Sequence, residues 1–144
     1  MTIIEVIKNK KQFLSLLLLA DEQENMIDRY LERGTMYVLN DNGVKAECVV
    51  TDECNGILEI KNIATVPEYQ GKGYAKALID FIVKEYADKY SVLQVGTGDS
   101  PLTVPFYEKC GFVRSHIIPN FFTDNYDHPI FCLLYTSDAA DEAR

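Results

Sequence analysis

Apolar and polar positions change their period near the middle of the chain. Apolar and β-branched side chains dominate residues 57–66, which indicates a strand, and an Asn55-Gly56 pair suited to a type I′ turn opens it. Pro67 has no N–H to donate to a strand ladder, so we expect the strand to end there. Across residues 74–86 the apolar side chains recur at helical spacing, which predicts an amphipathic helix. A strand, a loop and a long helix therefore form the centre of the expected fold.

Shorter patterned segments surround this centre. Before it we expect a strand at 3–7, a helix capped by Asn9 that runs to Ala20, a second helix that ends at Gly34, and strands at 35–40 and 44–51. After it we expect a strand at 92–96, a short helix from about Pro105 to Gly111, a strand at 112–118, and a last strand at 133–135. The early strands form an antiparallel meander, whereas the strand at 92–96 follows a helical crossover and should run parallel to the central strand. The pattern predicts an α+β protein with a mixed sheet.

Length and composition favour one domain. The chain has 144 residues, of which 47% are hydrophobic, enough for a single substantial core. We expect that domain to span residues 1–131. Residues 132–144 form a C-terminal tail, of which residues 136–144 look more like translated linker sequence than a native terminus, so we expect the native frame to be lost after about residue 131. No apolar run approaches the length that spans a bilayer, and no secretory leader is visible, which predicts a cytoplasmic protein without a membrane partner.

The net charge bears on the kind of binding partner, and the cysteine spacing bears on disulfides and metal sites. A net charge of −8 argues against nucleic acid, which requires a basic surface, and would suit a cationic amine, although acidity also serves solubility. The four cysteines show no C-x-x-C spacing and no histidines at metal-ligand intervals. Unpaired structural thiols are therefore favoured over a disulfide framework or a metal site.

The loop between the central strand and helix has the character of an anion site. Its sequence is QGKGYA, from Gln70 to Ala75, and two glycines at a helix start expose backbone N–H groups to a ligand. A P-loop is excluded because Tyr74 follows Gly73, and a dinucleotide loop is excluded because Lys76 stands where the third glycine belongs. The pattern that fits is Q/R-x-x-G-x-G/A.

This loop resembles the acyl-CoA pyrophosphate loop of the Gcn5-related N-acetyltransferase (GNAT) superfamily. A second match lies downstream, where residues 107–112 read YEKCGF and resemble the YEKxGF end of that family's later helix. Ser100 and Thr103 replace the usual Asn and Ala of the same helix. The resemblance covers roughly residues 2–131. It implies the GNAT fold, a central mixed and mostly antiparallel twisted sheet with helices on both faces.

The resemblance also implies site residues. Acetyl-CoA would be the acyl donor, and the residues expected to contact it are Ala64, Thr65, Val66, Gln70, Gly71, Lys72, Gly73, Tyr74, Ala75, Lys76 and Ser100. Tyr107, the tyrosine of YEKxGF, would donate a proton to the leaving thiolate. Strand alternation puts Glu59 and Asn62 on opposite faces of the central strand. Glu59 could be the base, whereas the Asn62 amide could only position water or the acceptor.

The activity that follows is transfer of an acetyl group to a primary amine by direct attack in a ternary complex. A small-molecule amine is the expected acceptor, and the two early helices would place Asp21, Glu22, Glu24 and Asp28 near it. Solvated helix surface is the other interpretation of each of these carboxylates. The aromatic segment 119–129 would line the acceptor site, mediate a homodimer contact or pack under a loop. The alternative function is a module of the same fold that binds acyl-CoA without turning it over.

Overall fold

The computed structural model describes residues 1–98, 103–118 and 130–135 of the chain. Its residues divide into two compact units. The first contains Met1–Asp52 and Ile60–Tyr86, and the second contains Glu53–Glu59 and Ala87–Arg144. The central strand β4 (Ile57–Thr65) contributes its first residues to the second unit and its remainder to the first.

In the first unit, helices surround a set of strands that pair in the order β1-β2-β3-β4. β1 pairs antiparallel with β2, and β2 pairs antiparallel with β3 with an irregularity between Leu39 and Asn40. The elements are β1 (Thr2–Val6), the 3₁₀ helix η1 (Lys10–Phe13), α1 (Leu14–Ala20), α2 (Glu24–Ile27), β2 (Thr35–Asn40), β3 (Val44–Asp52), β4, the 3₁₀ helix η2 (Pro67–Tyr69) and α3 (Tyr74–Tyr86).

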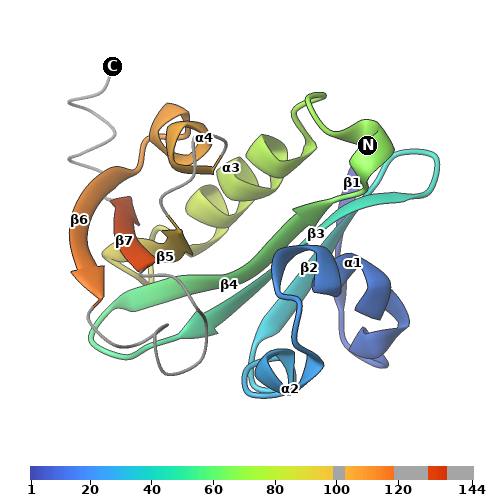
Figure 1. The fold of residues 1–144 in the computed structure, drawn as a ribbon, viewed down its shortest axis with the longest axis horizontal. Helices are drawn as coiled ribbons and strands as arrows, with labels where there is room; N and C mark the ends of the chain where they lie inside the picture. The colour runs from blue at the N-terminus through green and yellow to red at the C-terminus, as the bar shows by residue number, and fades with distance from the viewer. Residues whose placement is uncertain (99–102, 119–129, 136–144) are drawn as a thin grey trace. The chain divides into compact units, whose positions relative to one another are not determined.

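Helices cover both faces of these strands (Figure 1). Val38 belongs to a core cluster with Leu17 of α1 and Ile27 of α2, so its face of β2 points toward those two helices. Its neighbour Tyr37 points the other way, and its ring contacts the rings of Phe81 and Tyr86 on α3. α3 buries Leu78, Ile79 and Ile82 as the helical spacing predicted. The alternation along β2 thus separates an α1 and α2 face from an α3 face.

In the second unit the strands pair in the order β4-β5-β7-β6. β5 (Val92–Gly98) and β6 (Val113–Ile118) both pair antiparallel with β7 (Ile130–Tyr135). The short helix α4 (Thr103–Lys109) precedes β6. Residues 133–135 pair within β7, as their apolar character predicted.

The local predictions around β4 are confirmed. Asn55 and Gly56 have φ angles of 58° and 77°, as a type I′ turn requires, and the Ile57 N–H donates to the Cys54 carbonyl at 3.1 Å. β4 ends at Thr65 and α3 spans the predicted residues. The predicted α+β class is confirmed as well. Within the described ranges, no helix combines the length and the apolar character that crossing a membrane requires.

Two predictions about the early helices were wrong. Asn9 has a left-handed backbone and its side chain caps nothing, and η1 replaces the first turn of the expected α-helix. α2 spans four residues and does not continue to Gly34. The segment after α2 continues as turns, in which the Leu31 N–H donates to the Ile27 carbonyl at 3.0 Å and the Gly34 N–H to the Tyr30 carbonyl at 2.8 Å. The buried Lys10 ammonium donates to the carbonyls of Leu31 and Gly34 at 2.8 and 2.7 Å, at the end of this segment.

Candidate active site

The loop between β4 and α3 leaves space beside its two glycines. Gly71 and Gly73 have φ angles of 82° and 86°, and a Cβ atom built at either position would meet nothing within 4 Å. Glycine adopts this left-handed backbone readily, whereas other residues are strained in it. The space allows another molecule to approach the main chain closely.

α3 begins directly after this loop, and its N-terminal end adjoins the loop. The Ala77 N–H donates to the Gly73 carbonyl at 3.0 Å. The N–H groups of Tyr74 and Ala75 precede it and have no carbonyl one turn back within the helix. These donors and the dipole of a 13-residue helix favour an anion at this end.

Hydrogen bonds hold both ends of the loop. At its start, Nε2 of Gln70 donates to the Thr65 carbonyl at 3.4 Å, so this side chain folds back onto the end of β4. At its end, the Tyr74 hydroxyl donates to Oδ2 of Asp41 at 2.6 Å, and that hydrogen bond raises the pKa of Tyr74. The loop between these two contacts is fixed at its ends and open at its glycines.

Two lysines lie against one aromatic ring near the loop. Nζ of Lys45 is 4.2 Å and Nζ of Lys72 is 5.4 Å from the centroid of the Tyr69 ring. Both distances suit cation–π contacts. Lys76 instead forms an exposed ion pair with Asp80, 2.9 Å away and one turn further along α3. Lys45 and Lys72 therefore supply positive charge beside the loop.

A buried polar cluster lies on the α1 and α2 face of the first unit. Asn62 of β4 donates through Nδ2 to the Leu17 carbonyl at 2.9 Å and to the Tyr30 hydroxyl at 3.0 Å. Tyr30 in turn donates to Oδ2 of Asp21 at 3.2 Å. Burial raises the pKa of Tyr30, so this phenol remains protonated as the donor to Asp21. The chain of donors runs from Asn62 through Tyr30 to a carboxylate.

Glu47 of β3 belongs to the same face. It pairs with Val38 in the register of β2 and β3, and its side chain is fully buried. Neither carboxyl oxygen has a hydrogen-bond partner in the described part of the chain. Burial raises the pKa of Glu47 well above its ordinary value. A carboxyl group in such a setting is a candidate for a functional role.

The other two predicted catalytic residues lie in the second unit. Glu59 accepts a hydrogen bond from Nε2 of Gln94 on β5. Tyr107 of α4 is 7% exposed, and its ring makes edge contacts with Phe106 and Phe112 at centroid distances of 5.2 and 5.5 Å. Its ring is therefore held by aromatic packing.

Comparison with known proteins identifies the family. Residues 32–114, more than half of the chain, match the family model described as Acetyltransferase (GNAT) domain. The chain belongs to the GNAT acetyltransferase family. The predicted family and the predicted enzyme class, an acyltransferase, are both confirmed.

Relatives of this GNAT chain extend over nearly its whole length. An uncharacterized N-acetyltransferase of Bacillus subtilis, YvbK, is 35% identical over 123 residues, which are 83% of this chain and 79% of that protein. A GNAT family acetyltransferase from Elizabethkingia anophelis, solved with acetyl-CoA bound, is 30% identical with a TM-score of 0.86, over 94% of this chain and 97% of that one. An IAA acetyltransferase from Bacillus cereus is 31% identical with a TM-score of 0.82, over 94% and 99%. The GNAT fold is thereby confirmed.

The residues of this GNAT protein that were predicted to contact acetyl-CoA differ in what the structure shows of them. The Val66 N–H donates to the Lys45 carbonyl at 2.8 Å. The contacts of Ala64, Thr65 and Val66 with acetyl-CoA stay predictions. Ser100 lies outside the described residues, as do residues 119–129 and 136–144. The open backbone from Gly71 to Ala75 is the part of the predicted donor site that the structure brings together.

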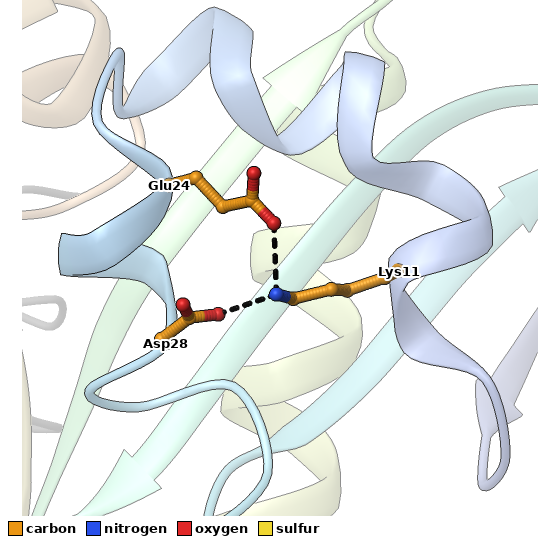
Figure 2. A network of polar contacts seen from close by, with 3 residues as sticks. All are labelled: Lys11, Glu24 and Asp28. Atoms are coloured by element: carbon orange, nitrogen blue, oxygen red, sulfur yellow. Dashed lines mark hydrogen bonds and ion pairs between the residues drawn. The ribbon is translucent and has the colours of Figure 1, made fainter.

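The acidic residues expected near the acceptor divide into two groups. Nζ of Lys11 lies 2.8 Å from Oε2 of Glu24 and 2.7 Å from Oδ1 of Asp28, which Figure 2 shows from close by. These contacts, led by that with Asp28, raise the pKa of the exposed Lys11. Asp21 is buried beside Tyr30. Of the four predicted carboxylates, Asp21 alone belongs to the buried cluster, Glu22 is exposed, and Glu24 and Asp28 form surface ion pairs.

Glu47 is the residue that sequence reasoning missed. A signal was present, because it is the one charged residue in the run Ala46–Val50, where both faces of β3 are buried. A carboxyl group in an otherwise apolar buried strand is rare without a partner or a role.

Within the described ranges, no three His, Cys, Asp or Glu side chains gather in a way that could hold a metal ion.

Proposed function

We propose that this protein is an N-acetyltransferase that transfers the acetyl group of acetyl-CoA to a primary amine by direct attack in a ternary complex. The open Gly71–Gly73 backbone at the start of α3, in a chain of the GNAT family, carries the proposal. A relative that is 30% identical binds acetyl-CoA, which supports the same donor here.

The loop residues fit the donor's pyrophosphate. Backbone N–H groups from Gly71 to Ala75 would contact it, because the glycines leave room and the helix start favours an anion. Lys72 would add positive charge, and Ala64 and Thr65 would pair with the extended arm of the donor through their backbone. The donor supplies an activated thioester carbonyl when bound.

Residues of this chain would manage the protons of the transfer. We assign Glu59 as the base that accepts the amine proton, directly or through water. Tyr107 would give its phenolic proton to the departing sulfur. The Tyr107 assignment follows from the sequence resemblance, and the Glu59 assignment follows from its position on the central strand. The packing of the Tyr107 ring between Phe106 and Phe112 is consistent with a fixed donor.

Thiol release from acetyl-CoA across a panel of primary amines tests this function. We expect amine-dependent release by the wild-type protein, and a kcat about 10² to 10⁴ times lower for Tyr107→Phe, the usual range for a lost general acid. Glu59→Gln should also lower kcat. The matched control is Tyr86→Phe, which removes a hydroxyl bonded to Tyr37 at 2.6 Å.

Two results would separate the parts of the proposal. Acetyl-CoA binding with no release on any amine would reject the enzyme in favour of a binding module. Release that is unchanged in Tyr107→Phe would reject the proton-donor role and leave the transfer activity in place.

A further inference from the structure

Three buried acceptor atoms on the α1 and α2 face have no donor within the described residues. They are Oε1 and Oε2 of Glu47 and Oδ1 of Asn62. The two side chains are 0% and 2% exposed. Buried acceptors without donors cost free energy, and the cost is larger for a group that can carry charge. Both side chains lie on the α1 and α2 face of the first unit, and their unpartnered oxygen atoms are suited to a donor from another molecule.

The orientation of Asn62 follows from its partners. Its Nδ2 contacts the Leu17 carbonyl at 2.9 Å, and a carbonyl can only accept a hydrogen bond. The amide nitrogen therefore lies on this side, and Oδ1 points away from it. Turning the amide over would lose the bond to Leu17, and the Tyr30 hydroxyl could then donate to Asn62 only by giving up its bond to Asp21. The free acceptor on Asn62 is thus imposed by the network behind it.

Glu47 lies close enough to this network to affect it. Burial is the main cause of the raised pKa of Tyr30, and the charges of Asp21 and Glu47 add to it. Glu47 likewise adds to the raised pKa of the neighbouring Cys48. The titratable groups around Glu47 are therefore Asp21, Tyr30 and Cys48. None of these three groups is a cation, so a Glu47 carboxylate has no positive partner among them, and a cationic ligand would supply one.

We propose that Glu47 and Asn62 bind a primary alkylammonium group of the acceptor, an inference that rests on the proposed acetyl transfer. With Glu47 ionised, an –NH₃⁺ group brings three N–H donors for three acceptors, whereas a water molecule brings two and a tertiary ammonium one. Val38 and Val49 share this face and are buried, so the ammonium would lie among apolar side chains. The net charge of −8 attracts such a cation.

The bound ammonium has two possible sources in the acceptor. It is the reacting nitrogen, or it is a second ammonium that anchors a diamine. Asn62 and Ala64 lie on the same face of β4, two residues and about 6–7 Å apart, and Ala64 is one of the backbone positions assigned to the thioester arm. In both cases the same ammonium–carboxylate contact forms at Glu47. Two acceptors of equal chain length, one with a single amine and one with two, distinguish the cases.

Direct binding is tested by carboxyl ¹³C NMR of protein labelled at glutamate, with Glu47→Gln used to assign the signal. In wild-type protein we expect n-pentylammonium to move the Glu47 titration to lower pH, because a cation favours the carboxylate. 1-Pentanol, equally long and uncharged, should leave it in place. A Glu47 titration that no alkylammonium moves, in protein that binds acetyl-CoA, overturns the site.

Kinetics distinguish the two sources. With n-pentylamine and 1,5-diaminopentane as acceptors, Glu47→Gln should lower kcat/KM about 10- to 150-fold, as for a lost charge-assisted hydrogen bond. If kcat/KM falls with both acceptors, Glu47 binds the reacting nitrogen. If it falls only with the diamine, mainly through a higher KM, Glu47 binds the second ammonium that anchors the acceptor. The control Glu85→Gln removes an exposed carboxylate of α3 and should change neither value.

The tests separate failure of the site from failure of the function. Wild-type kcat/KM for both amines in Glu47→Gln would overturn the site while transfer stands. If the wild-type protein acetylates neither amine, the proposed transfer to these acceptors fails, and the wild-type NMR titration still decides whether Glu47 binds an ammonium.

Discussion

Gly73 combines a left-handed backbone with empty space on the side where a side chain would lie. Its φ angle is 86°, and nothing in the described structure approaches within 4 Å of a Cβ built there. A methyl group at this position would strain the backbone without striking the protein. Any further effect on a ligand would come from the methyl group meeting that ligand.

The first prediction concerns Gly73→Ala. We expect it to lower the free energy of unfolding by about 1–2 kcal/mol, the cost of a left-handed alanine, and to weaken acetyl-CoA binding by more than that strain explains. Calorimetric titration with acetyl-CoA and thermal unfolding measure the two effects. Gly43→Ala is the matched control, because Gly43 also has a positive φ angle, 107°, and its added Cβ would meet only Lys45 Nζ at 3.5 Å. If both variants bind acetyl-CoA equally tightly, the assignment of the loop at Gly71 and Gly73 to acetyl-CoA is wrong.

Local patterns explain why some site residues could be predicted and others could not. The loop from Gln70 to Ala75 is contiguous, so its glycine spacing and the helix after it are visible in the sequence. The environment of Glu47 includes Tyr30, which lies far from it along the chain. Alternation placed Asn62 on the correct face of β4, but its bonds to Leu17 and Tyr30 depend on how α1 and α2 pack.

Among the elements, the segment after α2 is held by a tertiary contact that the local helix pattern does not reveal. Lys10 is 8% exposed, and its ammonium donates to the carbonyls of Leu31, Glu32 and Gly34 at 2.8, 3.4 and 2.7 Å. Lys11, the next residue, forms only the exposed ion pairs with Glu24 and Asp28 (Figure 2). Nothing in the local sequence distinguishes these two lysines. Strands and the long α3 were predictable because their period of apolar residues matches their burial.

The second prediction compares these neighbouring lysines. Lys10→Met should lower the free energy of unfolding by about 2–4 kcal/mol, because it leaves buried carbonyls without their charged donor. Lys11→Met should leave stability nearly unchanged, because exposed ion pairs contribute little. Urea denaturation of both variants measures the difference. A Lys11→Met variant as unstable as Lys10→Met would show that the Figure 2 network, and not the buried ammonium, holds α2 in place.

At the scale of the whole molecule, one buried carboxyl group links stability to pH. In the unfolded chain Glu47 ionises near its ordinary pKa of 4.5, whereas burial keeps it protonated to a much higher pH in the folded protein. Between these two values the folded state holds a proton that the unfolded state has lost. Stability therefore falls as pH rises through this range and is greatest below it.

The last prediction is that Glu47→Gln removes this decline, because an amide cannot ionise. Near pH 5 the variant and the wild-type protein should unfold at similar temperatures, and the variant should gain as pH rises toward 8. The slope for one proton is at most about 1.4 kcal/mol per pH unit, or roughly 3 to 6 °C in a domain of this size. Calorimetric melting curves from pH 5 to 8 measure it, with Glu85→Gln as the exposed control.

Parallel curves for Glu47→Gln and wild type would mean that Glu47 ionises in the folded protein without cost, and that its burial does not control its charge. A gain that disappears when n-pentylammonium is added would be the stability counterpart of the ammonium site, because a bound cation stabilises only the carboxylate that the wild-type residue can form.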